Sequence, residues 1–181
     1  MPRIFRHRSV TTPIARIRGS GGNICGTGFL IGARHVLTCA HVVDDALMRL
    51  RGTDKAPNEA VSLDLPFLNQ RELTANVVAW APMRSLESLE VDPVSDIAVL
   101  ELEETVEGGI ENHDVRLASP PLGTSFVTFG FPGGLDNGTE AGGEVRLTDA
   151  SGWHQVRDVQ VHGHFVEPGF SGAPVFDTDD G

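Results

Sequence analysis

Three side chains in this sequence, His41, Asp96 and Ser171, are of the types needed for nucleophilic acyl transfer. A serine hydroxyl is barely ionised near neutral pH, so it needs a neighbouring base, and a histidine base needs an acid to orient its ring. The three residues follow one another with gaps of 55 and 75 residues (96 − 41 and 171 − 96), each at the edge of a predicted apolar strand. Taken singly, they are more often a structural histidine, a turn aspartate and an ordinary tight turn. Together they predict a catalytic triad.

The serine lies in the stretch Gly169-Phe170-Ser171-Gly172, directly before an apolar run. Glycines allow strained turn angles and a close approach of substrate. Such a turn can aim the N–H groups of Gly169 and Ser171 at one point, where the oxyanion of an acyl-transfer intermediate would lie. The alternative nucleophile elbow, Gly-x-Ser-x-Gly with a later histidine, does not fit, because residue 173 is alanine and no histidine follows Ser171.

Other polar residues are weaker candidates. Asp92 is a second possible orienting acid, but no strand follows it directly. Asp44 and Asp45 are too close to His41 in sequence, and we expect them to be solvated. His162 and His164 have the i, i+2 spacing of a metal pair, but they lack acidic or cysteine partners at ligand spacing. We therefore expect no metal ligands and no cofactor.

Composition limits the classes of partner. The chain has 181 residues and a net charge of −11, which argues against nucleic acid or an anionic membrane surface as its main partner. It has neither a signal-peptide core nor an apolar run long enough to cross a membrane. Cys25 and Cys39 are too few for a disulfide framework, so we expect free thiols in a reducing compartment and a cytoplasmic location.

Short apolar runs separated by glycine and proline predict an all-β fold. Two groups of strands suggest two small barrels. We expect a basic arm over residues 1–12, a first barrel over 13–108, a connector over 109–124 and a second barrel over 125–181. The predicted strands are Ile14–Ile17, Ile24–Ile31, Val36–Cys39, Leu47–Leu50, Val61–Leu65, Leu73–Trp80, Ile97–Leu102, Val115–Leu117, Phe126–Phe131, Glu144–Thr148, Gln155–Val166 and Pro174–Phe176, with one helical turn at Ala40–Val43.

The sequence resembles the trypsin-like, or chymotrypsin-clan, serine proteases, in particular bacterial intracellular domains that are joined to other modules. The matching segments are Gly26–Ile31, Leu37–Val42, Ser95–Leu100, Gly130–Pro132 and Gly169–Val175, in the family's order. The resemblance implies two six-stranded antiparallel β-barrels with the active site between them. It also implies a polypeptide substrate, with Ser171 as nucleophile, His41 as base, Asp96 as orienting acid and the amides of Gly169 and Ser171 as the oxyanion hole.

The sequence departs from the family in three respects, one of which is that Cys25 and Cys39 do not both match the family's usual disulfide positions near the histidine. Phe170 stands where trypsins that are activated by cleavage carry an aspartate, so activation through a new amino terminus is not expected. The chain ends ten residues after Ser171, so we expect the second barrel to be incomplete. Counting back from Ser171 places Phe165 and Val166 near the floor of the substrate pocket, which favours a small or apolar residue before the scissile bond. An inactive, protease-like binding module is the alternative, but such a module has no physical need to keep all three triad residues.

Overall fold

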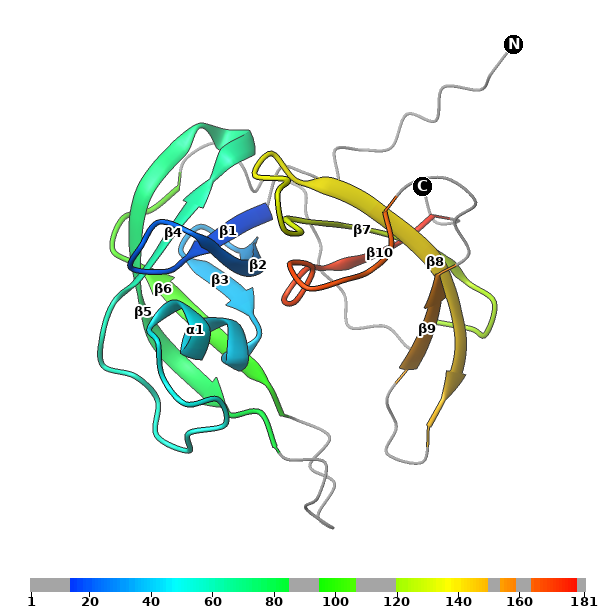
Figure 1. The fold of residues 1–181 in the computed structure, drawn as a ribbon, viewed down its shortest axis with the longest axis horizontal. Coiled ribbons are helices and arrows are strands. Elements are labelled where there is room, and N and C mark those ends of the chain that lie inside the picture. Colours follow the sequence, from blue (N-terminus) through cyan, green and yellow to red (C-terminus); the bar gives the residue numbers. More distant parts are fainter. Residues whose placement is uncertain (1–13, 85–94, 107–119, 150–153, 159–163, 179–181) are drawn as a thin grey trace.

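A computed structural model describes residues 14–84, 95–106, 120–149, 154–158 and 164–178. In these ranges the chain forms two β-sheets with one α-helix and one 3-10 helix (Figure 1), and the predicted all-β class is confirmed. The elements are β1 (Ile14–Arg18), β2 (Ile24–Ile31), β3 (His35–Thr38), α1 (Ala40–Ala46), β4 (Val61–Leu65), η1 (Pro66–Leu68), β5 (Gln70–Ala81), β6 (Ile97–Leu102), β7 (Ser125–Gly130), β8 (Thr139–Thr148), β9 (His154–Asp158) and β10 (Val175–Asp177).

The first six strands close into an antiparallel barrel in the order β1-β2-β3-β6-β5-β4. Alternate side chains of each strand point into the barrel and fill its interior. In β6, Ala98, Leu100 and Leu102 are buried, whereas Ile97 is exposed on the opposite face. Closure leaves this barrel without free strand edges. Its core comprises mainly Ala15, Ile17, Leu30, Val36, Val42, Val43, Val61, Leu63, Leu65, Ala75, Ala98, Leu100 and Leu102.

The second lobe is a four-stranded antiparallel sheet in the order β10-β7-β8-β9. β7 and β8 form a regular hairpin, and β10 pairs with the other edge of β7, with Val175 opposite Thr128. The buried hydroxyl of Thr128 donates a hydrogen bond of 2.8 Å to the carbonyl of Pro174, which fixes the segment that enters β10. In the described residues this sheet does not close, so the predicted chymotrypsin-like arrangement with an incomplete second lobe is confirmed.

Apolar side chains from both lobes join in a second buried cluster. Ile14 and Phe29 of the barrel pack with Phe129 and Phe131 of the second lobe. Phe129 makes edge-to-face contacts with Phe131, at 5.7 Å between ring centroids, and with Phe67, at 5.2 Å. Edge-to-face pairs of this kind add to the free energy gained from burying apolar surface. This cluster sets the position of one lobe against the other.

A buried arginine reinforces the same junction. Arg16 of β1 donates two hydrogen bonds to the carboxylate of Asp64, at 2.6 and 2.8 Å, and Arg18 donates a third at 2.9 Å. The remaining Nη1 group of Arg16 donates to the carbonyl of Asp136 at 2.6 Å, in the loop between β7 and β8. Its guanidinium also lies over the ring of Phe131, 5.6 Å from the centroid. One side chain of the first barrel therefore binds the second lobe through polar and cation–π contacts.

The helix α1 differs from the sequence prediction. The helix continues to Ala46 rather than ending at Val43, and the predicted strand Leu47–Leu50 is wrong. Leu47 and Met48 form a turn, with Met48 in the left-handed region at φ 53°. None of the helices in the described ranges has the length and hydrophobicity needed to cross a lipid bilayer.

The second lobe also differs from prediction in its strand ends. β8 begins at Thr139, well before the predicted start at Glu144. β9 ends at Asp158, and Phe165 and Val166 lie outside any strand, so the long strand predicted to reach residue 166 is wrong at that end. The predicted strand at 115–117 and the basic arm at 1–12 lie outside the described residues.

Candidate active site

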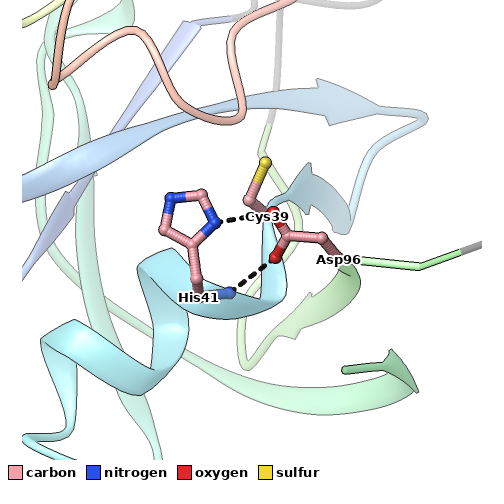
Figure 2. Close-up of side chains that lie close together, drawn as sticks. All are labelled: Cys39, His41 and Asp96. Carbon is pink, nitrogen blue, oxygen red and sulfur yellow. Dashed lines mark hydrogen bonds and ion pairs between the residues drawn. The ribbon is translucent and has the colours of Figure 1, made fainter. Parts of the chain in front are cut away.

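His41 and Asp96 are joined by two hydrogen bonds. The Nδ1 atom of His41 lies 2.6 Å from Oδ2 of Asp96, and the backbone amide of His41 donates to Oδ1 at 2.9 Å (Figure 2). His41 is in the first turn of α1, directly after β3, and Asp96 precedes β6 by one residue. β3 and β6 are paired, with Thr38 opposite Ala98, so the barrel itself brings the two side chains together. The carboxylate thus fixes both the ring and the backbone of the histidine.

Asp96 has an unusual backbone conformation. Its φ of 59° lies in the left-handed region, which aspartate tolerates better than most residues with a Cβ. Its amide donates to the carbonyl of Pro82 at 3.3 Å. Sparsely populated backbone conformations persist where the surrounding structure holds them, and they cluster at functional sites. Here the residue in this conformation carries the carboxylate that is hydrogen-bonded to the histidine.

The loop that carries Ser171 is bound to β2 of the first barrel. The amide of Thr27 donates to the carbonyl of Ser171 at 2.9 Å, and its hydroxyl donates to the carbonyl of Gly169 at 2.7 Å. The hydroxyl of Thr38 in turn donates to the carbonyl of Thr27 at 2.6 Å. Gly172, at φ 82°, packs so closely that a Cβ there would lie 2.1 Å from the Thr27 carbonyl. The loop therefore requires glycine at this position.

The predicted oxyanion donors lie in the same loop. Gly169 has φ 112°, a conformation that favours glycine, and a Cβ there would lie 2.4 Å from the carbonyl oxygen of Phe131. Within the described ranges, the amides of Gly169 and Ser171 donate to no acceptor.

His41 and Ser171 line one open hollow of about 460 Å³. The other residues around it are Arg51, Val166, Glu167, Pro168 and Phe170. Among the described residues no hydrogen bond joins the ring of His41 to the hydroxyl of Ser171. Val166 lines the same hollow, whereas Phe165 does not line it and is 65% exposed.

The buried side chain of Phe170 packs the serine loop against β7. Its side chain is only 5% exposed, and its ring lies against Gly130, where a Cβ would come within 2.6 Å of it. The position that holds an aspartate in cleavage-activated trypsins is therefore filled here by an apolar side chain. Burial of the ring holds the loop without an ion pair to a new amino terminus.

Two aspartates of α1 have roles that sequence reasoning missed. Asp45 accepts a hydrogen bond from Nε of Arg51 at 2.7 Å, which raises the pKa of Arg51 and places this cation at the hollow. Asp44 is fully buried, so the expectation that it is solvated is wrong. It accepts from the amide of Gly52 at 3.1 Å and lies 3.7 Å from Nε of Arg49, yet burial raises its pKa. No sequence signal distinguishes Asp44 from a surface aspartate.

Cys39 completes the immediate surroundings of the histidine. Burial, followed by the negative charge of Asp96, raises the pKa of the Cys39 thiol to about 12. Burial likewise raises the pKa of Cys25, and both cysteines are free thiols. Cys39, His41 and Asp96 are the one group of potential metal ligands in the described ranges. His162 lies outside these ranges, and the Nδ1 atom of His164 lies 3.7 Å from the carboxylate of Glu167.

Comparisons with known proteins agree with this architecture. The family model of the trypsin-like peptidase domain matches residues 26–181, and no curated protein matches the chain. The structure is similar to that of a serine endoprotease from Yersinia pestis, with a TM-score of 0.65, 19% identity and coverage of 94% of this chain. This chain spans only 52% of that one. It is also similar to the inactive form of the Rv3671c protease from Mycobacterium tuberculosis, with a TM-score of 0.57, 22% identity and coverage of 94% of this chain and 74% of that one. At these identities, both structures support the fold alone.

Proposed function

Because this chain belongs to the trypsin-like peptidase domain family, we propose that it is a serine endopeptidase that acts through His41, Asp96 and Ser171. The observation that carries the proposal is the 2.6 Å hydrogen bond between His41 and Asp96. It belongs to a histidine that lines the same hollow as Ser171. A base oriented by a carboxylate, beside a serine in a glycine-rich loop, is the arrangement that acyl transfer requires.

The proposed reaction begins with attack of the Ser171 hydroxyl on a peptide carbonyl. Nε2 of His41 takes the hydroxyl proton while Asp96 accepts the Nδ1 hydrogen bond and stabilises the imidazolium. The amides of Gly169 and Ser171 donate to the oxyanion. The carbon–nitrogen bond then breaks, the leaving amine takes the proton from His41, and an acyl-enzyme remains. Water, activated by the same histidine, hydrolyses that ester and restores Ser171.

No hydrogen bond joins His41 to Ser171 in the described residues, so we assign this bond to the complex with substrate. Catalytic hydrogen bonds are often long in free enzymes and tighten when substrate binds. The bonds from Thr27 to the serine loop leave the amides of Gly169 and Ser171 free for this purpose. The substrate carbonyl oxygen would then accept hydrogen bonds from these two amides and order the serine loop against His41.

The proposed specificity is for a small or apolar residue before the scissile bond, with Phe165 and Val166 near that residue. Val166 supports this part of the proposal, because it lines the hollow with His41 and Ser171. A peptide library should then be cleaved after residues such as alanine and valine, and Val166→Asp should weaken that preference. Preferential cleavage after arginine or lysine would contradict it.

We also place the enzyme in a larger bacterial protein and in the cytoplasm. The two free thiols, Cys25 and Cys39, suit a reducing compartment. The larger context is supported by the Yersinia structure, of which this chain covers about half. Cell fractionation with an antibody against this chain tests both statements, through the compartment and the mass of the product detected.

The decisive test of the function is labelling of the full-length protein by a fluorophosphonate probe. This probe forms a covalent bond only with an activated serine, so the parent should be labelled and Ser171→Ala should not. His41→Ala should also lose labelling, because it removes the proposed base that activates the hydroxyl. Ser62→Ala removes an exposed serine on β4 and serves as the matched control, which should be labelled like the parent.

The alternative function, a protease-like binding module without activity, predicts a different result. A folded parent that shows a cooperative thermal transition but no labelling would support the module and contradict the peptidase. Labelling that persists in Ser171→Ala would contradict the assignment of the nucleophile.

A further inference from the structure

Cys39 lies close to His41 and Asp96, the proposed base and its orienting acid, but the proposed reaction does not use the thiol. Cys39, His41 and Asp96 each offer one ligand atom, and these atoms all lie within 4.8 Å of one another (Figure 2). All three side chains are held by the barrel: Cys39 is the N-cap residue of α1, His41 is in its first turn, and Asp96 precedes the strand that pairs with β3. The group is therefore a built cluster rather than a chance meeting of mobile surface chains.

We propose that Cys39, His41 and Asp96 bind a thiophilic divalent cation of the Zn²⁺ class, which reversibly inhibits the peptidase. Inhibition rests on the proposed function, whereas cation binding does not. A thiolate, an imidazole and a carboxylate are all ligands that zinc accepts. Three protein ligands leave a fourth position for water. The thiolate and carboxylate charges also balance those of the cation, so the partly buried site carries no net charge when the cation is bound.

The chemistry of binding explains why the cation inhibits. The cation takes the Nδ1 lone pair of His41, so the proton that Nδ1 carries and shares with Asp96 in a hydrogen bond moves through solvent to Nε2. The Cys39 thiol loses its proton to solvent, so one proton is released for each cation bound, and nothing is oxidised or reduced. Nε2 then carries a hydrogen and can no longer accept the proton of Ser171. The cation thus blocks the base without touching the serine.

Binding requires a limited movement of side chains. Ligand atoms on one tetrahedral zinc lie roughly 3.3–3.8 Å apart, given metal–ligand distances of about 2.0–2.3 Å. The 2.6 Å contact between His41 and Asp96 must therefore open by about an ångström, because a zinc ion bound to both separates them. Their shared hydrogen bond is lost in the process, so the active enzyme and the metal complex exclude each other.

Zinc sensitivity of the full-length protein tests the inhibition. The chelator-treated protein is titrated with zinc chloride, and the rate of fluorophosphonate labelling is compared with each variant's own metal-free rate. Cys39→Ala should require at least about tenfold more zinc for half-inhibition, since it loses a direct ligand. Cys25→Ala removes the other free thiol, which lies outside the cluster, and should respond like the parent. Equal zinc sensitivity of the parent and Cys39→Ala would overturn the proposal.

Cobalt binding tests the site without relying on activity. Cobalt(II) chloride added to the parent should produce a thiolate-to-cobalt charge-transfer band. The band should be absent in Cys39→Ala, weakened in His41→Ala and retained in Ser171→Ala. No cobalt–thiolate band in the folded parent would overturn the metal site. A band in a parent that the fluorophosphonate does not label would uphold the metal site and contradict the proposed function instead.

Discussion

The amide of Thr27 donates a hydrogen bond of 2.9 Å to the carbonyl oxygen of Ser171, so a strand of the first barrel holds the candidate nucleophile of the second lobe. The hydroxyl of the same threonine donates to the carbonyl of Gly169, which also accepts from the amide of Phe131 at 3.1 Å. The serine loop is therefore fixed from both lobes, and its conformation depends on a residue far away in sequence.

Replacing Thr27 with valine removes the hydroxyl while keeping the branched shape of the side chain. The loss of one neutral hydrogen bond should lower the free energy of unfolding by about 1 kcal/mol. Because a small displacement of a reacting group can cost up to about a hundredfold in rate, we expect kcat to fall by about tenfold or more, with a smaller change in KM. Thr27→Ser keeps the hydroxyl and should remain close to the parent. Steady-state kinetics on a peptide substrate measure kcat and KM, and urea denaturation measures the free energy of unfolding. An unchanged kcat in Thr27→Val would contradict the positioning role.

Truncating Phe170 to alanine should destabilise the fold. The buried ring fills the space against Gly130, and removal of a buried phenylalanine typically costs about 3–5 kcal/mol. Phe165→Ala removes the same atoms from a side chain that is 65% exposed and should change the free energy of unfolding by less than about 0.5 kcal/mol. Urea denaturation of both variants provides the comparison. Similar effects of the two substitutions would show that Phe170 is not an anchor.

Asp64 to alanine should be strongly destabilising. Arg16 would lose its two hydrogen bonds to that carboxylate, and leaving a buried charge uncompensated typically costs about 3–5 kcal/mol. Its bond to the Asp136 carbonyl would satisfy only part of the guanidinium. Glu144→Ala breaks the more exposed pair with Arg146, which should cost about 0–1 kcal/mol. Thermal denaturation should rank the two variants in this order, and the reverse order would refute the account of the lobe junction.

Asp44 should make stability depend on pH. Burial raises its pKa above the ordinary value of 3.8 despite the opposing effects of Arg49 and of the Gly52 amide, and the charges of Asp45 and Asp96 raise it further. The folded state therefore binds the proton more tightly than the unfolded state. Stability is gained as pH falls through the raised pKa towards 3.8 and is lost as pH rises back through this window.

The test compares the parent with Asp44→Asn, which cannot take up the proton. The free energy of unfolding of the parent minus that of the variant should increase as the pH is lowered from 7 towards 4. Asp54→Asn changes an exposed aspartate and should show no such trend. A constant or falling difference for Asp44→Asn would show that burial does not govern this carboxyl group.

The first barrel was predictable because each of its strands carries its own local signal. Ile97–Leu102 alternates buried and more exposed residues, and Gly32 allows the tight turn between β2 and β3 at φ 70°. The pairing of His41 with Asp96 was also predicted, and it follows from the neighbouring positions of β3 and β6. That Ser171 acts with them stays a prediction.

The remaining features depend on tertiary contacts that no local pattern records. The segment Leu47–Leu50 resembles a strand, yet it directly follows the helix α1. That helix contains the buried Asp44, and the burial of a charged residue could not be predicted from the sequence. Thr27 reads as an ordinary strand residue, and its bonds to the serine loop span more than 140 positions of sequence. The sequence around Cys39 predicts only a buried thiol, and its nearness to Asp96 results from the tertiary fold.

The attachment of the Ser171 loop to β2 also bears on how such a domain diversifies. The strand that binds this loop belongs to the lobe that carries His41 and Asp96, so one lobe supplies two of the proposed catalytic residues and holds the loop of the third. Under the proposed function, mutations around Val166 would reshape the wall that selects the peptide while the reactive groups keep their positions. Selection would then tune which peptides are cut separately from the cleavage reaction itself.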